Sequence, residues 1–194
     1  MENLLELSLE QLTQLIEKEV NKKIENFGLD IAQFEFVSEQ QFVEDSLKNG
    51  WNEEDARIAY ANLILPASST IDSAGFDFKT PYEICLEPNQ SILIPTGIRC
   101  KMDKHWALIL CPRSGHGTKY RVQLDNTIGV IDKDYYDAKN EGHIMAKITN
   151  DGKEEKVFSL KSGEKFIQGL FLYTGTAKNA VGTDIRIGGL GSTL

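Results

Sequence analysis

Residues 126–137, NTIGVIDKDYYD, carry two acids and a tyrosine at a spacing that could support catalysis. The apolar and turn-forming residues indicate a β-hairpin arm, with Asp132, Asp134 and Tyr135 near the end of a strand. Two carboxylates at such a place can bind a metal ion or take a proton from water. Two acids that flank a lysine are also typical of a solvated turn, so this stretch alone leaves both interpretations open.

Residues 111–122, CPRSGHGTKYRV, have the composition of a phosphate-binding loop. Arg113 offers a planar fork suited to phosphate oxygens, Ser114 adds a hydroxyl, and Gly115 and Gly117 allow backbone N–H groups to approach an anion. The stretch lacks the Gly-Lys-Ser or Gly-Lys-Thr ending of a Walker A loop. An ordinary turn would also fit it.

The last ten residues, IRIGGLGSTL, are rich in glycine. Such an end is either frayed or a working part of a site. The composition alone does not decide between the two.

A helical pattern runs from Ser8 to about Ala61 and precedes all of these motifs. Ser8 and Gln11 have the spacing of a capping box, and Gly28 can end the first helix. Its apolar residues recur at intervals of three and four: Leu12, Leu15, Ile16, Val20 and Ile24.

Two shorter helices are predicted after the first. Ser38 and Gln41 repeat the capping pattern, and Gly50 closes the turn that follows. Asn52 precedes three consecutive acids, which suit the beginning of a helix.

After Pro66 the sequence changes to short apolar runs separated by turn residues, which predicts many short strands. We therefore expect a mainly β fold, a sandwich or barrel of the jelly-roll kind, with an N-terminal helical extension. The expected domains are residues 1–62 and 63–194. The clearest strand candidates are residues 92–94, 107–111, 144–148 and 166–173.

Composition excludes several classes of protein. The formal net charge of −8 argues against a broad nucleic-acid surface, and no run of apolar residues is long enough to span a membrane. The acidic first residues disfavour a signal peptide. Cys85, Cys100 and Cys111 have neither disulfide arithmetic nor metal spacing, so we expect buried thiols and a cytoplasmic protein.

Five short motifs in order carry a resemblance to a known family: SAGFDFKT (73–80), PRSGHGTK (112–119), NTIGVIDKDY (126–135), GEKFIQ (163–168) and RIGGLGST (186–193). Together they resemble the signature of the homotrimeric dUTP diphosphatases, the dUTPases, over residues 62–194. The resemblance implies a distorted jelly-roll β-barrel in a homotrimer with active sites between subunits. It also implies hydrolysis of dUTP to dUMP and pyrophosphate, with Mg2+ on the triphosphate.

The third motif implies the residues that perform the reaction and recognise the nucleoside. Asp132 would be the base that activates water for in-line attack on the α-phosphorus. Asn126 would recognise uracil together with its neighbours, and Tyr135 would pack beneath the sugar and exclude a 2′-hydroxyl. Those neighbours are Gly129, Val130 and Ile131.

The other motifs imply a phosphate site and a lid. Arg113, Ser114, Gly115 and Gln168 would bind phosphates, and Asp77 would organise the metal through water. The C-terminal motif would close over a neighbouring subunit's nucleotide through Arg186, Gly189, Leu190, Gly191, Ser192 and Thr193.

Four features depart from the family pattern. Leu190 stands where a phenylalanine usually stacks on uracil, and Lys165 replaces a common arginine. Residues 137–141, DAKNE, form an apparent insertion. The helical extension of residues 1–62 lies outside the family core.

Alternative functions stay open. A dCTP deaminase shares the fold, but HIMAKITND (143–151) offers no glutamate where that family is expected to carry one. Residues 1–62 are expected to be a small packing or oligomerisation module. A nucleotide-sensing trimer would instead bind a protein through them, with Phe34, Phe36 and Trp51 as anchors. His105, His116 and His143 are scattered and form no nucleophilic arrangement with serine or cysteine.

Overall fold

A computed structural model describes residues 8–25, 31–179, 182 and 188 of this chain. The chain divides into two compact units, residues 1–32 and 33–194. The helices of residues 39–61 thus belong to the same unit as the sheets. A domain boundary between residues 62 and 63 stays a prediction.

The first unit contains helix α1 (Leu9–Glu25), which begins with the predicted capping box. The Ser8 backbone N–H donates to Gln11 Oε1 at 2.9 Å, and the Gln11 N–H donates to Ser8 Oγ at 3.2 Å. Leu15, Ile16 and Val20 are exposed on this helix. No helix in the described part of the chain is long and apolar enough to cross a membrane.

The second unit is mainly β. Its helices are α2 (Glu39–Lys48), α3 (Glu53–Ala61), α4 (Ser114–Tyr120) and the 3-10 helix η2 (Lys133–Asp137). Its strands are β1 (Ala32–Phe36), β2 (Ala67–Ser68), β3 (Gly75–Lys79), β4 (Ile84–Leu86), β5 (Ser91–Pro95), β6 (Ile98–Met102), β7 (Trp106–Pro112), β8 (Val122–Leu124), β9 (Gly129–Ile131), β10 (Met145–Asn150), β11 (Phe158–Leu160) and β12 (Lys165–Tyr173).

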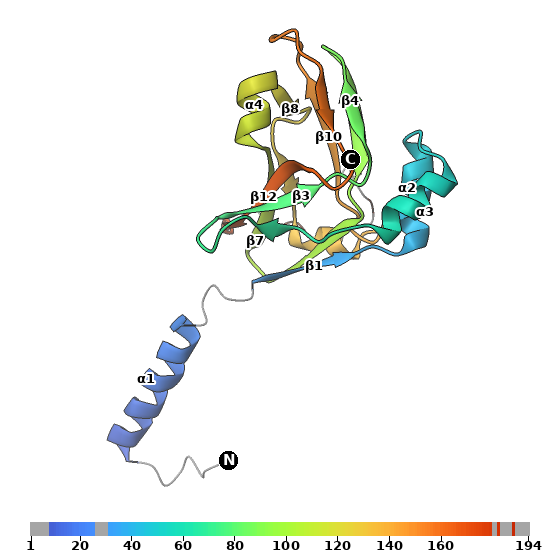
Figure 1. The fold of residues 1–194 in the computed structure, drawn as a ribbon. Coiled ribbons are helices and arrows are strands. Elements are labelled where there is room, and N and C mark those ends of the chain that lie inside the picture. Colours follow the sequence, from blue (N-terminus) through green and yellow to red (C-terminus); the bar gives the residue numbers. More distant parts are fainter. Residues whose placement is uncertain (1–7, 26–30, 180–181, 183–187, 189–194) are drawn as a thin grey trace. The chain divides into compact units, whose positions relative to one another are not determined.

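The strands form four small sheets (Figure 1). The largest has the order β2-β3-β12-β7-β9 with antiparallel pairing, and a second has the order β5-β10-β8. The pairs β11-β4 and β1-β6 complete the set. A mainly β, antiparallel fold is thus confirmed. The sheets are open among the described residues and do not close into the expected barrel, because the edge strands of the four sheets, such as β2 and β9, do not pair with one another.

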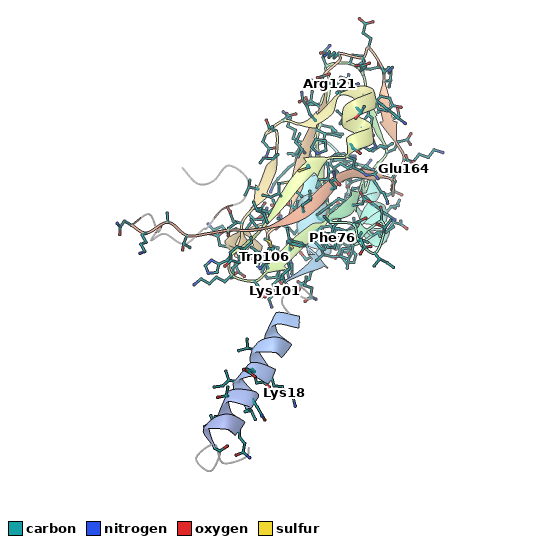
Figure 2. All side chains as sticks on the ribbon, turned by 90° about the vertical axis from the view of Figure 1, so that its left-hand side faces the viewer. Lys18, Phe76, Lys101, Trp106, Arg121 and Glu164 are labelled. Atoms are coloured by element: carbon teal, nitrogen blue, oxygen red, sulfur yellow. The ribbon has the colours of Figure 1, made fainter. Side chains whose placement is uncertain are left out.

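The core of the five-stranded sheet lies around β12. Phe78, Leu108, Phe166 and Ile167 are almost fully buried there. A side chain on Gly169 would place its Cβ 2.8 Å from Leu108 Cδ1, so this strand position is held by glycine for close packing. Figure 2 labels Phe76 and Trp106 on two other strands of the same sheet.

Helices α2 and α3 lie side by side (Figure 1), and their buried side chains form a second hydrophobic core that includes Tyr82. Both predicted caps are confirmed, since Ser38 Oγ accepts from the Gln41 N–H and Asn52 Oδ1 from the Asp55 N–H. Phe42 is fully buried in this core, and the Trp51 ring stacks on Tyr82 with centroids 4.2 Å apart. The cluster contains Val37, Phe42, Val43, Ala56, Ala59 and Tyr82.

Strand β1 interrupts the stretch expected to be helical. Its Phe34 ring lies 5.6 Å from the Phe76 ring and 5.8 Å from Phe171, centroid to centroid, so this side chain packs inside the fold. Trp51 is likewise partly buried, and of the three suggested partner anchors only Phe36 is exposed. The expectation of buried thiols holds for Cys100 but is wrong for Cys85, which is exposed.

Candidate functional site

An ion cluster around Asp77 forms the centre of the candidate phosphate site. Asp77 lies on β3 with 8% of its surface exposed. Its Oδ1 accepts from Arg113 Nε at 2.9 Å, and its Oδ2 lies 2.8 Å from Lys165 Nζ. Ser69 Oγ also donates to Oδ2 at 2.6 Å. The carboxylate therefore orients both cations.

This cluster keeps Asp77 ionised. Burial acts to raise the pKa of Asp77, but hydrogen bonds from Lys165 and Ser69 and the charge of Arg113 outweigh burial, and the pKa lies below its ordinary value. Because Nε of Arg113 donates to Asp77, the guanidinium plane is fixed. Its terminal nitrogens have no hydrogen-bond partner among the described residues and can meet an anion.

The predicted phosphate loop is a helix, α4, rather than a loop. Arg113 is its N-cap residue, and the Gly117 N–H donates to the Arg113 carbonyl at 3.0 Å. The amide of Gly117 is thus used inside the helix, contrary to its expected role toward an anion. Ser114 and Gly115 are exposed, and a Cβ on Gly115 would meet nothing within 4 Å.

Gln168 approaches the same place from the adjacent strand. It lies opposite Asp77 on one side and Cys111 on the other, and its Nε2 donates to the Pro112 carbonyl at 3.3 Å. Gly75 leaves room for it, because a Cβ there would lie 2.9 Å from Gln168 Oε1. Figure 2 labels Arg121 just after α4 and Glu164 just before β12, the elements that carry Ser114 and Gln168.

A cavity of about 550 Å³ joins these side chains. It brings together five residues that were predicted from separate motifs. Its lining is Ser69, Ser73, Ala74, Gly75, Asp77, Arg113, Ser114, Gly115, Gln168 and Leu170.

The His116 side chain connects α4 to strands β11 and β12. Its Nδ1 lies 3.2 Å from the Phe166 carbonyl, and its ring meets Phe158 edge-on with centroids 4.9 Å apart. Burial lowers the pKa of His116 below its ordinary value, so the imidazole is neutral at pH 7. These contacts explain why a segment with two glycines is helical.

A second cavity, of about 180 Å³, lies beside the turn between β8 and β9. The expected β-hairpin arm is wrong here, because β8 pairs with β10 and β9 pairs with β7. Gly129 lies opposite Leu110, and a Cβ on it would come 3.1 Å from Leu110 Cβ. The lining is Leu110, Leu124, Asp125, Asn126, Gly129, Val130, Ile131, Met145, Ala146 and Lys147. This cavity therefore holds all four residues expected to recognise uracil, and most of its lining is apolar.

Asp132 follows this cavity directly. It is exposed, and its backbone carbonyl accepts from the Tyr135 N–H at 3.1 Å at the beginning of η2. Tyr135 is buried, and its hydroxyl donates to the His143 carbonyl at 2.8 Å while accepting from Asn140 Nδ2 at 3.0 Å. The ring of Tyr135 is consequently fixed by the fold. Within the described residues no cluster of three or more His, Cys, Asp or Glu could hold a metal ion.

The two cavities share no lining residue. Within one chain, the candidate phosphate-binding residues therefore line a different cavity from the candidate uracil-binding residues. The six lid residues, Arg186, Gly189, Leu190, Gly191, Ser192 and Thr193, lie outside the described residues.

The sequence did not indicate two members of the site. Ser69 precedes the first motif, and its contact with Asp77 comes from the pairing of β2 with β3. Lys165 had been noted only as a substitution for arginine, whereas it forms an ion pair with Asp77. A serine before the first motif and a cation at the beginning of β12 are the only signals that sequence offers for them.

A comparison with protein families finds that the dUTPase family model matches residues 61–193. The chain is 35% identical over 136 residues to the deoxyuridine 5'-triphosphate nucleotidohydrolase of Lactococcus lactis, covering 69% of this chain and 89% of that protein. It is 37% identical over 121 residues to the protein of that name from Shewanella piezotolerans, with 61% and 74% covered.

Among solved structures, the chain is similar to a dUTPase from Streptococcus mutans. The TM-score is 0.56 at 29% sequence identity, and the match covers 74% of this chain and 97% of that one.

Proposed function

This chain belongs to the dUTPase family, and on that premise we propose that it hydrolyses dUTP to dUMP and pyrophosphate. The observation that carries the proposal is the meeting of Asp77, Arg113, Ser114, Gly115 and Gln168 in one cavity. These residues come from three separated motifs. A charged and hydroxyl-bearing cavity of this kind suits a chain of phosphates.

Recognition of the nucleoside falls to the cavity beside the turn between β8 and β9. Asn126 can match one donor and one acceptor on the uracil edge, and the peptide groups of residues 129–131 complete the contacts. Gly129 leaves the pocket open to a pyrimidine because it presents no side chain opposite Leu110. Tyr135 excludes a ribose through the fixed position of its ring.

Asp132 performs the proton transfer in this proposal. Water is a poor nucleophile unless a positioned acceptor takes its proton as the new P–O bond forms. Asp132 is exposed and directly follows the base-pocket strand β9, and in this proposal its carboxylate orients a water in line with the α-phosphorus. Pyrophosphate then leaves, and Arg113 and Ser114 stabilise the charge that develops on the phosphates.

Mg2+ belongs to this scheme as part of the substrate, because it is expected to arrive on the triphosphate, whose charge it reduces. The residues around Asp77 fit a contact through water rather than direct ligation. Its Oδ2 already accepts from Ser69 and Lys165, whereas Oδ1 accepts only from Arg113 within the described chain. One remaining acceptor position can orient a water of the hydrated cation.

The proposal includes a homotrimer. Since the base cavity and the phosphate cavity of one chain share no residue, a site assembled from neighbouring chains would supply both sets to one nucleotide. The third motif would come from one chain and the lid residues Arg186 to Thr193 from another. A cytoplasmic location suits the thiols of Cys85, Cys100 and Cys111, none of which forms a disulfide.

The test is a release assay with Mg2+ and four nucleotides: dUTP, dCTP, dTTP and UTP. We expect pyrophosphate from dUTP alone, at a rate that Asp132→Asn reduces by two orders of magnitude or more, on the order of a general base's contribution. No pyrophosphate from an intact oligomer would refute the proposal. Ammonia release from dCTP would instead support the deaminase alternative.

A further inference from the structure

The N-terminal extension contacts the third motif through the insertion. The insertion loop, residues 137–141, follows η2 directly, and segment 35–48 of β1 and α2 lies against it. Three polar links join the two regions, and each link pairs a side chain of the extension with one of residues 136–143. Segment 35–48 lies before the residues that the family model matches, whereas residues 136–143 lie within them.

The first link caps helix α2. The Ser38 N–H donates to Glu141 Oε2 at 2.7 Å, and Ser38 Oγ donates to Glu141 Oε1 at 2.6 Å. Burial acts to raise the pKa of Glu141, but these hydrogen bonds from Ser38 outweigh it and keep the pKa below the ordinary value. A carboxylate that accepts two hydrogen bonds at a helix N-terminus is a strong anchor.

The second link fixes the residue next to Tyr135. Tyr136 Oη donates to Glu35 Oε2 at 2.7 Å, and Arg99 Nη2 donates to the same oxygen at 2.8 Å. The Arg99 guanidinium also lies 4.3 Å from the centroid of the Tyr136 ring. The hydrogen bond from Tyr136 lowers the pKa of Glu35, which therefore stays ionised.

The third link is buried. His143 Nδ1 lies 2.7 Å from Asp45 Oδ2 on α2, and His143 Nε2 accepts from the Gly97 N–H at 2.8 Å. Because Nε2 is the acceptor, the proton lies on Nδ1 and is donated to Asp45. The His143 side chain is 0% exposed. The His143 carbonyl in turn accepts a hydrogen bond from the Tyr135 hydroxyl.

The insertion loop itself is arranged around Tyr135. Asn140 Nδ2 donates to the Tyr135 hydroxyl and, at 3.3 Å, to the His143 carbonyl, while its buried Oδ1 has no hydrogen-bond partner among the described residues. Leaving a buried acceptor unpaired is unfavourable, so the position of the Asn140 amide is determined by the hydrogen bonds that its nitrogen donates. Asn140 and His143 therefore hold the Tyr135 hydroxyl, and the extension in turn binds His143 and the residues on either side of the loop.

We propose that Glu35, Ser38 and Asp45 are positioning residues that hold Tyr135, through residues 136–143, at the distance that excludes a ribose. The inference rests on the proposed function, since it assigns the extension a part in selecting dUTP over UTP. A ring that excludes one hydroxyl must be held to a fraction of an ångström, and small displacements change rates by large factors.

The test compares link variants with matched controls. Glu141→Gln keeps the shape but places an amide N–H₂ where Ser38 needs an acceptor, and Tyr136→Phe removes the hydrogen bond to Glu35 while keeping the ring. Lys139→Ala changes an exposed side chain of the same loop, and Gly163→Ala strains the turn before β12, which makes none of the three links. Each variant is assayed for kcat and KM with dUTP and with UTP, and for its Tm.

We expect both link variants to lower the ratio of kcat/KM for dUTP to that for UTP about tenfold. The two controls should leave the ratio unchanged, even where Gly163→Ala lowers the Tm by as much as a link variant does. Link variants that lower the Tm and keep the wild-type ratio would overturn the inference, because the contacts would then serve stability alone.

Amide hydrogen exchange separates this inference from the proposed function. If the wild-type protein does not turn over dUTP, the proposed function is refuted. The effect of the links on Tyr135 can still be measured from hydrogen exchange at the Tyr135 and Ala138 amides, which are hydrogen-bonded in this segment. We expect faster exchange in Glu141→Gln and no change in Lys139→Ala. Equal protection in the two variants would overturn the inference.

Discussion

Replacing Gly142 with alanine tests how closely the insertion loop packs on the third motif. Gly142 has a φ of +68°, and a Cβ on it would lie 2.7 Å from both the Tyr135 carbonyl oxygen and the Tyr136 Cα. These are backbone atoms that cannot rotate away. Gly163 is the matched control, since its φ is +83° but a Cβ there would meet nothing within 4 Å.

The magnitude follows from two separate effects. A left-handed backbone costs an alanine about 1–2 kcal/mol, and this strain is common to both positions. Overpacking against fixed neighbours adds about 1–3 kcal/mol, and only Gly142 has such neighbours. We therefore expect a loss in the free energy of unfolding of about 2–5 kcal/mol for Gly142→Ala against about 1–2 kcal/mol for Gly163→Ala.

Urea unfolding monitored by circular dichroism measures the loss in the free energy of unfolding, and a dUTP turnover assay measures the effect on activity. If Gly142→Ala folds, displacement of the Tyr135 backbone should lower kcat/KM, while Gly163→Ala should keep it. Equal losses in unfolding free energy for the two variants would refute the close approach. An unchanged kcat/KM for Gly142→Ala would refute the dependence of the third motif on the loop.

Four further predictions concern the site and the extension. Asp132→Asn should lower kcat by about a hundredfold or more and leave dUTP binding intact in calorimetry, as expected for a general base. Because the pKa of Asp77 is lowered, its ion pairs should stabilise the fold above pH 3.8, the group's ordinary pKa, and this stabilisation should be lost as the pH falls through the lowered value. In urea unfolding at several pH values, the free energy of unfolding should therefore fall less on acidification in Asp77→Asn than in the wild type. Leu190→Phe should lower the KM for dUTP about fivefold if ring stacking contributes about 1 kcal/mol, and an unchanged KM would contradict this. Deleting residues 1–31 should preserve the Tm and turnover of the larger unit, whereas loss of turnover would show that the first unit takes part in activity.

Local sequence predicted the helices well where a single side chain decides. Ser8, Ser38 and Asn52 begin α1, α2 and α3 as expected, because a cap acts on amides two or three residues away. The apolar runs likewise predicted β5, β7, β10 and β12.

Elements that depend on distant contacts were not predicted. Strand β1 is extended because Phe34 packs on Phe76 and Phe171, far along the chain. Helix α4 contains two glycines, which disfavour a helix, and contacts of His116 and Tyr120 with Phe158 hold it instead. Tertiary packing overrode local propensity in both cases.

The candidate site was predicted in part. The motifs contain the five candidate phosphate residues and the four candidate uracil residues in the two cavities, but the resemblance could not say which of them meet within one chain. The contact between Ser69 and Lys165 spans 96 residues, and the links from α2 to residues 141 and 143 span about as many. Such partners depend on the register of strands and on loops that local sequence does not specify.

The ion cluster around Asp77 has a consequence for the choice among anions. The carboxylate offsets one of its two cations, Arg113 and Lys165, so the cluster presents a single net positive charge. Inorganic phosphate gains little Coulomb attraction from so weak a field, whereas a triphosphate carries its own counter-cation and makes contacts along its length. Occupancy by substrate then depends on the number of contacts more than on charge, and turnover should persist in phosphate buffer and at moderate salt.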